Sequence, residues 1–173
     1  MRISKRKLDH FLSSATKEEL IQQLMDLVSR FENVEEYYQT KLNRDIPKIL
    51  DKYKKEITDA LYPDGEWKGG FDLEAVEKTI KKYEKMGSPL ASVISLKLFA
   101  IKSASELADA FGGDYGENFY IFFEEIYEEM HKDLKENGQL NNYKEQLKSV
   151  IEEAFEGYGH RDQLMDVYKG YFR

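Results

Sequence analysis

Apolar residues recur every three or four positions along almost the whole chain, and polar residues fill the positions between them. This period is that of an amphipathic α-helix, which buries one face and leaves the other in water. No segment combines strict apolar–polar alternation with the β-branched content and flanking turns of a strand. The pattern therefore predicts an all-α protein.

Cap and turn residues divide this pattern into separate helices. Thr16 and Glu19 have the spacing of a capping box, in which each side chain binds the other's backbone amide, so a helix is expected over residues 17–32 after a first one over 4–14. Gly87 is expected to end the helix that begins at Asp72, and Gly138 the helix that begins near Glu117. The remaining helices are expected to begin near Asn33, Pro47, Asp72, Ser88–Pro89, Glu117 and Leu140, and after Gly159.

The clearest loop is Tyr62–Asp72, because it contains turn residues and two adjacent glycines. It holds the only tryptophan, Trp67, and is predicted to be the most mobile internal segment. A chain of 173 residues has the length of one domain, so a single domain over residues 1–173 is expected. Tight connections favour a stack of antiparallel helix hairpins, similar to a helical repeat, or alternatively an irregular globular bundle.

Composition narrows the chemistry. Hydrophobic residues make up 41% and charged residues 34%, which is typical of a globular protein. The chain has no cysteine, so disulfide frameworks, thiolate zinc sites and cysteine nucleophiles are excluded. The basic N-terminus is not followed by an apolar stretch of signal-peptide length, and no apolar run is long enough to span a membrane. A cytoplasmic protein without a membrane partner is expected.

Charge is spread unevenly. Residues 1–48 contain nine Lys and Arg against eight Asp and Glu, a net charge of +1. Since the whole chain has a net charge of −7, residues 49–173 carry −8. An acidic body repels nucleic acid, so only the N-terminal part is a candidate for binding it. Its first helices, with Arg2, Lys5, Arg6 and Lys7, resemble small helix-extension-helix DNA-binding modules, although acidic residues follow at once.

Two constellations suggest ligand chemistry and have simpler explanations. Glu128 and His131 have the Glu-x-x-His spacing of di-iron bundles, but there is no second copy and Glu128 is expected to face water. The glycine-rich loop over residues 112–116 lacks the Lys-Ser/Thr of a phosphate-binding loop. Its Asp114, and Glu117 beyond it, are expected to cap the next helix.

Tyr37, Tyr38 and Lys41 form a candidate interaction surface. Lys41 follows the two tyrosines by four and three residues, so on a helix its ammonium can lie over a ring or donate to a hydroxyl. Twelve tyrosines and ten phenylalanines also provide contact area for a core or an interaction groove. Packing within the core is the alternative explanation for these rings.

The segment after Gly157 and Gly159 gathers the most varied polar chemistry. The glycines let the chain turn sharply into a last helix, whose first turn then contains the four polar residues His160, Arg161, Asp162 and Gln163. Free backbone amides at that turn and the Arg161 guanidinium can bind an anion, with His160 assisting. Alternatively the segment is a structural pin, in which Asp162 satisfies the amides and Arg161 pairs with an acid on a neighbouring helix.

Three stretches resemble a bacterial family known only as a domain of unknown function. The resemblance runs from end to end of the chain and implies an all-helical cytoplasmic protein, without implying an activity or catalytic residues. It rests on Lys5–Leu8 with Lys17–Ile21, on Glu36–Asn43 and on Gly157–Leu164.

No nucleophile, base and orienting group are assembled in any motif of the sequence, and no cofactor motif is present. The first hypothesis is therefore a non-enzymatic protein-interaction module with another protein as partner. The first alternative is a small-ligand or anion-binding protein, or an enzyme, centred on His160, Arg161 and Asp162. The second is an accessory nucleic-acid binder that uses the basic N-terminus.

Overall fold

The computed structural model describes residues 4–42, 45–62 and 70–172. In these ranges the chain forms nine α-helices and no strand, which confirms the all-α class. The predicted loop Tyr62–Asp72 falls largely on residues 63–69, and these residues, Trp67 included, lie outside the described part. Arg2 of the basic N-terminus also lies outside it.

The helices follow one another with short connections, and two of them are preceded by a 3₁₀ turn, η2 (Leu140–Tyr143) before α8 and η3 (Gly157–Gly159) before α9. Their bounds are α1 Lys5–Ser13, α2 Lys17–Arg30, α3 Glu32–Lys41, α4 Ile46–Leu61, α5 Leu73–Lys85, α6 Leu90–Phe111, α7 Glu117–Glu136, α8 Lys144–Glu152 and α9 His160–Tyr171.

The chain divides into two compact units, Met1–Asp45 and Ile46–Arg173. The N-terminal unit contains α1, α2 and α3, and the C-terminal unit contains the other six helices. The expectation of a single domain over residues 1–173 stays a prediction. None of the described helices is both long and apolar enough to cross a membrane.

Helix caps in the N-terminal unit follow the sequence closely. The Thr16 hydroxyl accepts from the Glu19 amide at 3.2 Å, and a Glu19 carboxylate oxygen accepts from the Thr16 amide at 2.8 Å, so the predicted capping box is confirmed. Ser4 caps α1 in the same way by accepting from the amide of Lys7. Despite these caps, no residue of α1 or α2 is buried.

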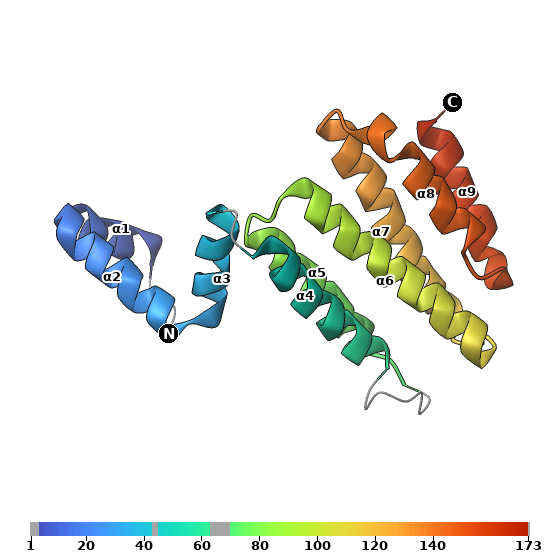
Figure 1. Ribbon diagram of the computed structural model, residues 1–173, viewed down its shortest axis with the longest axis horizontal. Coiled ribbons are helices and arrows are strands. Elements are labelled where there is room, and N and C mark those ends of the chain that lie inside the picture. Colours follow the sequence, from blue (N-terminus) through green and yellow to red (C-terminus); the bar gives the residue numbers. More distant parts are fainter. Residues whose placement is uncertain (1–3, 43–44, 63–69, 173) are drawn as a thin grey trace. The chain divides into compact units, whose positions relative to one another are not determined.

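The C-terminal unit is a stack of three antiparallel helix hairpins, α4–α5, α6–α7 and α8–α9 (Figure 1). Helix α6 packs against α4, α5, α7 and α8, and α7 packs against α9. The central position of α6 explains its composition, because a helix that is covered on several sides is apolar nearly all round. Its fully buried residues include Leu96, Ile101 and Leu107.

Two predicted helix starts differ from the observed ones. Phe31, in extended conformation, ends α2 and is itself the N-cap of α3, so Asn33 lies inside the first turn and does not cap it. Ser88 does not cap α6, because its hydroxyl donates to the Tyr83 carbonyl at 2.8 Å and so completes the end of α5. By contrast, the Asp72 cap of α5 is confirmed: its carboxylate accepts from the Ala75 amide at 2.9 Å.

Candidate functional site

The segment that joins α8 to α9 makes the sharp turn expected from its glycines. Tyr158 and Gly159 both have left-handed backbone conformations, with φ of 56° and 70°. Gly157 is needed for a different reason, since a Cβ there would collide with the ring of Phe155. Helix α9 then begins at His160, which places His160, Arg161, Asp162 and Gln163 in its first turn as predicted.

Arg161 binds the end of helix α8. Its Nε donates to the Ala154 carbonyl at 3.0 Å, and its Nη2 donates to the same oxygen at 2.5 Å and to the Glu152 carbonyl at 3.3 Å. Its Nη1 donates to the carboxylate of Glu156, which is largely exposed. Carbonyls at a helix C-terminus have no partner within the helix and favour a cation, so Arg161 joins the end of α8 to the start of α9.

The contact with a neighbouring helix that was expected of Arg161 is made by His160 instead, as a hydrogen bond. The Nδ1–H of His160 donates to Oε1 of Glu124, on α7, at 2.8 Å. Both side chains are largely enclosed, with 3% of His160 and 16% of Glu124 exposed. The donors of Arg161 are directed to Glu152, Ala154 and Glu156, and the contact with α7 is made by its neighbour His160.

Asp162 and Gln163 are exposed, and neither side chain has a hydrogen bond within the described residues. The N-cap position of α9 is Gly159, which has no side chain to cap with. The prediction that Asp162 satisfies the amides of this turn is therefore wrong. The turn forms through the left-handed backbone of the residues before it, and Asp162 contributes its charge near the positive end of the helix.

The space beside His160 is filled. The rings of Tyr120, Phe123 and Phe155 close around it, together with Ser105, and the remaining space has no room for a water molecule. An imidazole oriented by a carboxylate is a feature of many hydrolytic sites, but it also needs an adjacent place for the substrate. The geometry therefore favours a packed contact between α7 and α9.

The glycine-rich loop before α7 is connected to the same segment. Asp114 accepts a hydrogen bond from the Tyr158 hydroxyl, and Tyr158 stacks on Tyr120 with ring centroids 5.1 Å apart. The hydrogen bond to Asp114 is the main cause that raises the pKa of Tyr158. Asp114 therefore binds a side chain near α9 and does not cap α7 as expected, since the N-cap of α7 is Gly116, which makes no side-chain hydrogen bond.

The candidate surface on α3 has the predicted cation–ring geometry. The Lys41 ammonium lies 5.4 Å from the centroid of the Tyr37 ring, and the Tyr37 and Tyr38 rings meet edge to face at 5.2 Å. Tyr37 is exposed and Tyr38 is half-buried. The structure therefore brings these three residues together on one helix, and their role as an interaction surface stays a prediction.

His131 is enclosed by aromatic rings, among them Tyr127, Tyr171 and Phe172. Its Nδ1–H donates to the Tyr127 carbonyl at 2.8 Å, and its Nε2 has no partner among the described residues. Burial lowers the pKa of His131, and this outweighs the opposing effect of the hydrogen bond to the Tyr127 carbonyl. Glu128 pairs with Lys132 at the surface at 2.8 Å, and no metal-ligand cluster occurs in the described part of the chain.

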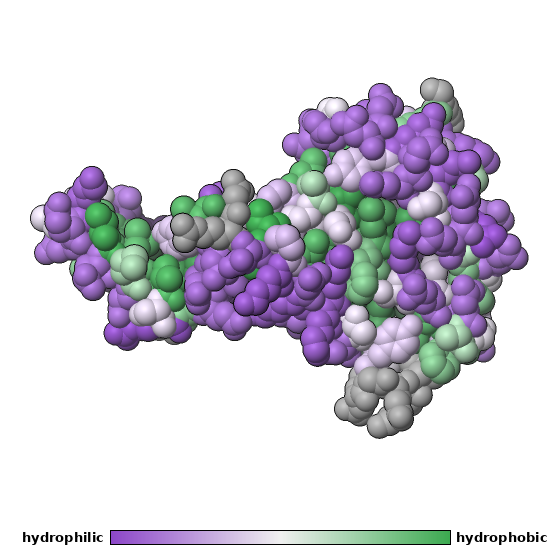
Figure 2. Space-filling model, viewed as in Figure 1, coloured by the Kyte–Doolittle hydropathy of each residue, from purple (hydrophilic) through white to green (hydrophobic). Residues whose placement is uncertain are grey.

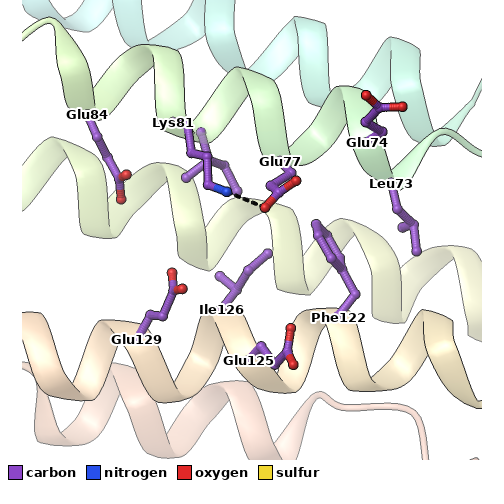
Figure 3. Close-up of a pocket in the computed structure, with 10 residues that line it drawn as sticks. Leu73, Glu74, Glu77, Lys81, Glu84, Phe122, Glu125, Ile126 and Glu129 are labelled. Carbon is purple, nitrogen blue, oxygen red and sulfur yellow. Dashed lines mark hydrogen bonds and ion pairs between the residues drawn. The ribbon is translucent and has the colours of Figure 1, made fainter.

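A groove between α5 and α7, which the sequence did not reveal, combines apolar and charged groups in the C-terminal unit (Figure 3). Its volume is about 380 Å³. The ribbon of α6 passes behind it, and side chains from α5 and α7 point into it from both sides. Its apolar residues are Leu73, Ile80, Phe122 and Ile126, and its charged residues are Glu74, Glu77, Lys81, Glu84, Glu125 and Glu129.

Charge in this groove is strongly negative. Five carboxylates and one ammonium line it. Glu77 pairs with Lys81, and Glu74 pairs with Lys78 just outside the groove at 2.5 Å. Glu125 has no ion-pair partner among the described residues, so the α7 side of the groove carries uncompensated negative charge.

Lys97 of α6 fixes one end of the groove from beneath. Only 2% of its side chain is exposed, and its ammonium lies 2.8 Å from Glu84, 3.0 Å from Asp133 and 3.6 Å from Glu129. Burial disfavours its charge, but the hydrogen bonds to Glu84 and Asp133 prevail and raise the pKa of Lys97. It therefore remains charged and holds α5, α6 and α7 together.

The sequence contains one signal for this arrangement. Lys97 is the one charged residue in the first half of α6, and a buried lysine requires carboxylates around it. The groove itself could not be seen in the same way, because its two sides are about 45 residues apart in sequence. Only the packing of α5 and α7 on α6 brings them to the same face.

Comparison with known proteins places the chain in a family. No curated protein and no solved structure matched it. A family model does match it over nearly its whole length, which confirms the resemblance seen in the sequence. The chain belongs to a family of unknown function, DUF6155, whose model covers residues 3–170.

Proposed function

We propose that this protein is a non-enzymatic interaction module that binds a basic amphipathic helix of a partner protein in the groove between α5 and α7. The observation that carries the proposal is the chemistry of the groove, an apolar floor flanked by carboxylates. An amphipathic helix binds such a groove with its apolar stripe, and lysines or arginines beside the stripe pair with the flanking acids.

The dimensions of the groove suit a helix of about three turns. Its α5 side extends from Leu73 to Glu84, and eleven residues of helix rise by roughly 16 Å. Ile80 and Ile126 are nearly covered in the floor, whereas Leu73 and Phe122 are half-buried and available for contact. A ligand helix would place two or three large apolar side chains against them.

The two alternatives have less support. The donors of Arg161 are directed to Ala154, Glu152 and Glu156, so an anion would have to compete with these acceptors. Nucleic-acid binding would rest on Lys5, Arg6 and Lys7 alone among the described residues of the N-terminal basic cluster.

Two designed peptides test the proposal. Both are helical and three to four turns long, with the same stripe of leucines, and one carries lysine and the other glutamate beside the stripe. Fluorescence anisotropy with the full chain measures binding at low and physiological salt. The lysine peptide is expected to bind, more weakly as salt rises, and the glutamate peptide is expected not to bind.

Matched variants locate the binding. Glu125→Lys in the groove is expected to raise the dissociation constant of the lysine peptide about tenfold or more. The substitution replaces attraction by repulsion at the position of the unpaired carboxylate. Glu145→Lys, at an exposed position in the first turn of α8, makes the same change of charge outside the groove. Equal weakening by both variants would mean that net charge alone attracts the peptide, and the groove would lose its assigned role.

A further inference from the structure

Helices α1 and α2 carry apolar stripes that the helices of the N-terminal unit leave exposed. The stripes are plain in the sequence and remain at the surface in the structure, as the green side chains of this part of the molecule show (Figure 2). The exposed residues of this face, here called the N-terminal apolar face, are Leu8, Phe11, Leu12, Ile21, Leu24, Met25, Leu27 and Phe31, each 37–60% exposed.

Helices of this length need such a face to be covered. They contain nine and fourteen residues, and isolated helices shorter than about 12–15 residues are marginal in water even when their sequences favour helix. Most helical stability in proteins comes from packing of the amphipathic face. The Ser4 and Thr16 caps fix where the helices begin, but they do not supply that packing.

The size of the face matches one half of an ordinary protein interface. Eight large side chains that are each about half exposed present roughly 600–700 Å² together, if a fully exposed side chain of this kind offers about 150–200 Å². Two such faces bury about 1,200–1,400 Å² in total, which is within the range of stable interfaces. A second copy of the chain therefore provides a cover of the right area.

Charges around the face favour a second copy over a membrane or a nucleic acid. The basic first turn of α1, with Lys5, Arg6 and Lys7, is matched by the acidic first turn of α2, with Glu18 and Glu19. In a two-fold contact the same patch meets itself, so mixed charge of this kind is self-complementary. An anionic membrane or a nucleic acid would favour a net basic surface, whereas residues 1–48 carry a net charge of only +1.

We propose that the N-terminal apolar face is a homodimerisation surface, on which α1 and α2 of two copies pack across a two-fold axis. The proposal is independent of the function proposed for the α5–α7 groove. A dimer would also present two grooves, so a partner with two basic helices would bind with an avidity that one copy lacks.

Analytical ultracentrifugation of the full chain over a range of concentrations tests the proposal. The wild-type chain is expected to sediment as a dimer that dissociates on dilution. Leu24→Glu places a charge in the centre of the face and is expected to raise the dimer dissociation constant by about 100-fold or more. Gln22→Glu, an exposed position on the opposite side of α2, is the matched control and is expected to leave the dimer intact.

The same samples can also overturn the dimer proposal. A wild-type chain that stays monomeric at all concentrations tested would overturn the proposal, and so would a dimer that Leu24→Glu leaves unchanged. Flotation with phosphatidylcholine–phosphatidylserine vesicles distinguishes the membrane as occupant. If a monomeric wild-type chain binds these vesicles and Leu24→Glu does not, the face is a membrane anchor and the dimer is rejected. Circular dichroism of each variant confirms that the helices of the C-terminal unit are retained.

Discussion

Both units of this chain contain amphipathic helices, but the C-terminal unit buries its apolar faces and α1 and α2 of the N-terminal unit leave theirs exposed. In the C-terminal unit, the stripes of six helices meet in one continuous core, with Leu107 and Tyr127 fully buried. In the N-terminal unit, α1 and α2 bury no residue. An apolar stripe therefore shows that a helix has a face to cover, and the structure is needed to decide whether the same chain covers it.

The largest expected difference between the units comes from truncating one leucine in each. Leu107→Ala leaves a cavity in the core around α6 and is expected to lower the free energy of unfolding by about 2–5 kcal/mol. Leu24→Ala removes a side chain that is 42% exposed and is expected to change it by less than about 1 kcal/mol. Chemical denaturation at low protein concentration measures both. Comparable losses from the two variants would contradict the contrast.

The second effect concerns the buried pair between α7 and α9. His160→Ala is expected to lower the free energy of unfolding by about 2–3 kcal/mol, because Glu124 keeps its enclosed position without a partner. The double variant His160→Ala with Glu124→Ala should regain part of this loss, since it removes the unpaired charge. If the loss of unfolding free energy in the double variant equalled the sum of the losses in the two single variants, the two residues would act independently.

Arg161 is expected to contribute less, because 36% of its side chain is exposed. Arg161→Ala should lower the free energy of unfolding by about 1–2 kcal/mol, because the carbonyls of Glu152, at the end of α8, and of Ala154, just beyond it, lose their donor. Arg161→Lys should recover only part of the lost stability, since an ammonium lacks the planar fork of donors with which the guanidinium reaches two carbonyls. If Arg161→Ala left the melting temperature unchanged but abolished binding of an anionic ligand, Arg161 would be a binding residue and its structural role as a pin between α8 and α9 would be rejected.

The smallest expected effect is the pH dependence of stability that His131, in the C-terminal core, contributes. Because the folded-state pKa of His131 is below its usual 6.5, the unfolded chain takes up a proton first as the pH falls, and its contribution to stability is present above about pH 6.5 and lost below it. Between pH 7 and 6 the loss should stay under about 1 kcal/mol. His131→Phe should reduce this pH dependence of the unfolding free energy, and an unaltered profile would show that another group causes it.

Local features of the fold were predictable because nearby residues determine them. Thr16 and Glu19 form their capping box within one turn, and Asp72 caps α5 through an amide three residues away. The turn into α9 at Gly159 was also readable, since it needs a left-handed backbone. These features depend on spacing within a few residues, which a single sequence contains.

Features that depend on distant packing were not predictable. His160 meets Glu124 across 36 residues, and no local pattern favoured it over Arg161 as the residue that reaches another helix. The groove requires Phe122 and Leu73 to lie on the same face, which only the arrangement of α5 and α7 on α6 determines. Even α1 and α2, whose stripes were evident, did not reveal that these stripes remain uncovered.

Hydrogen exchange of the full chain at several protein concentrations tests the contrast between the units most directly. If a second copy covers the N-terminal apolar face, backbone amides of α1 and α2 should exchange more slowly as concentration rises, while those of α6 and α7 keep the same slow exchange throughout. Leu24→Glu should remove the concentration dependence and leave the C-terminal unit unaffected. Equally slow exchange in α1, α2, α6 and α7 at every concentration would contradict the account.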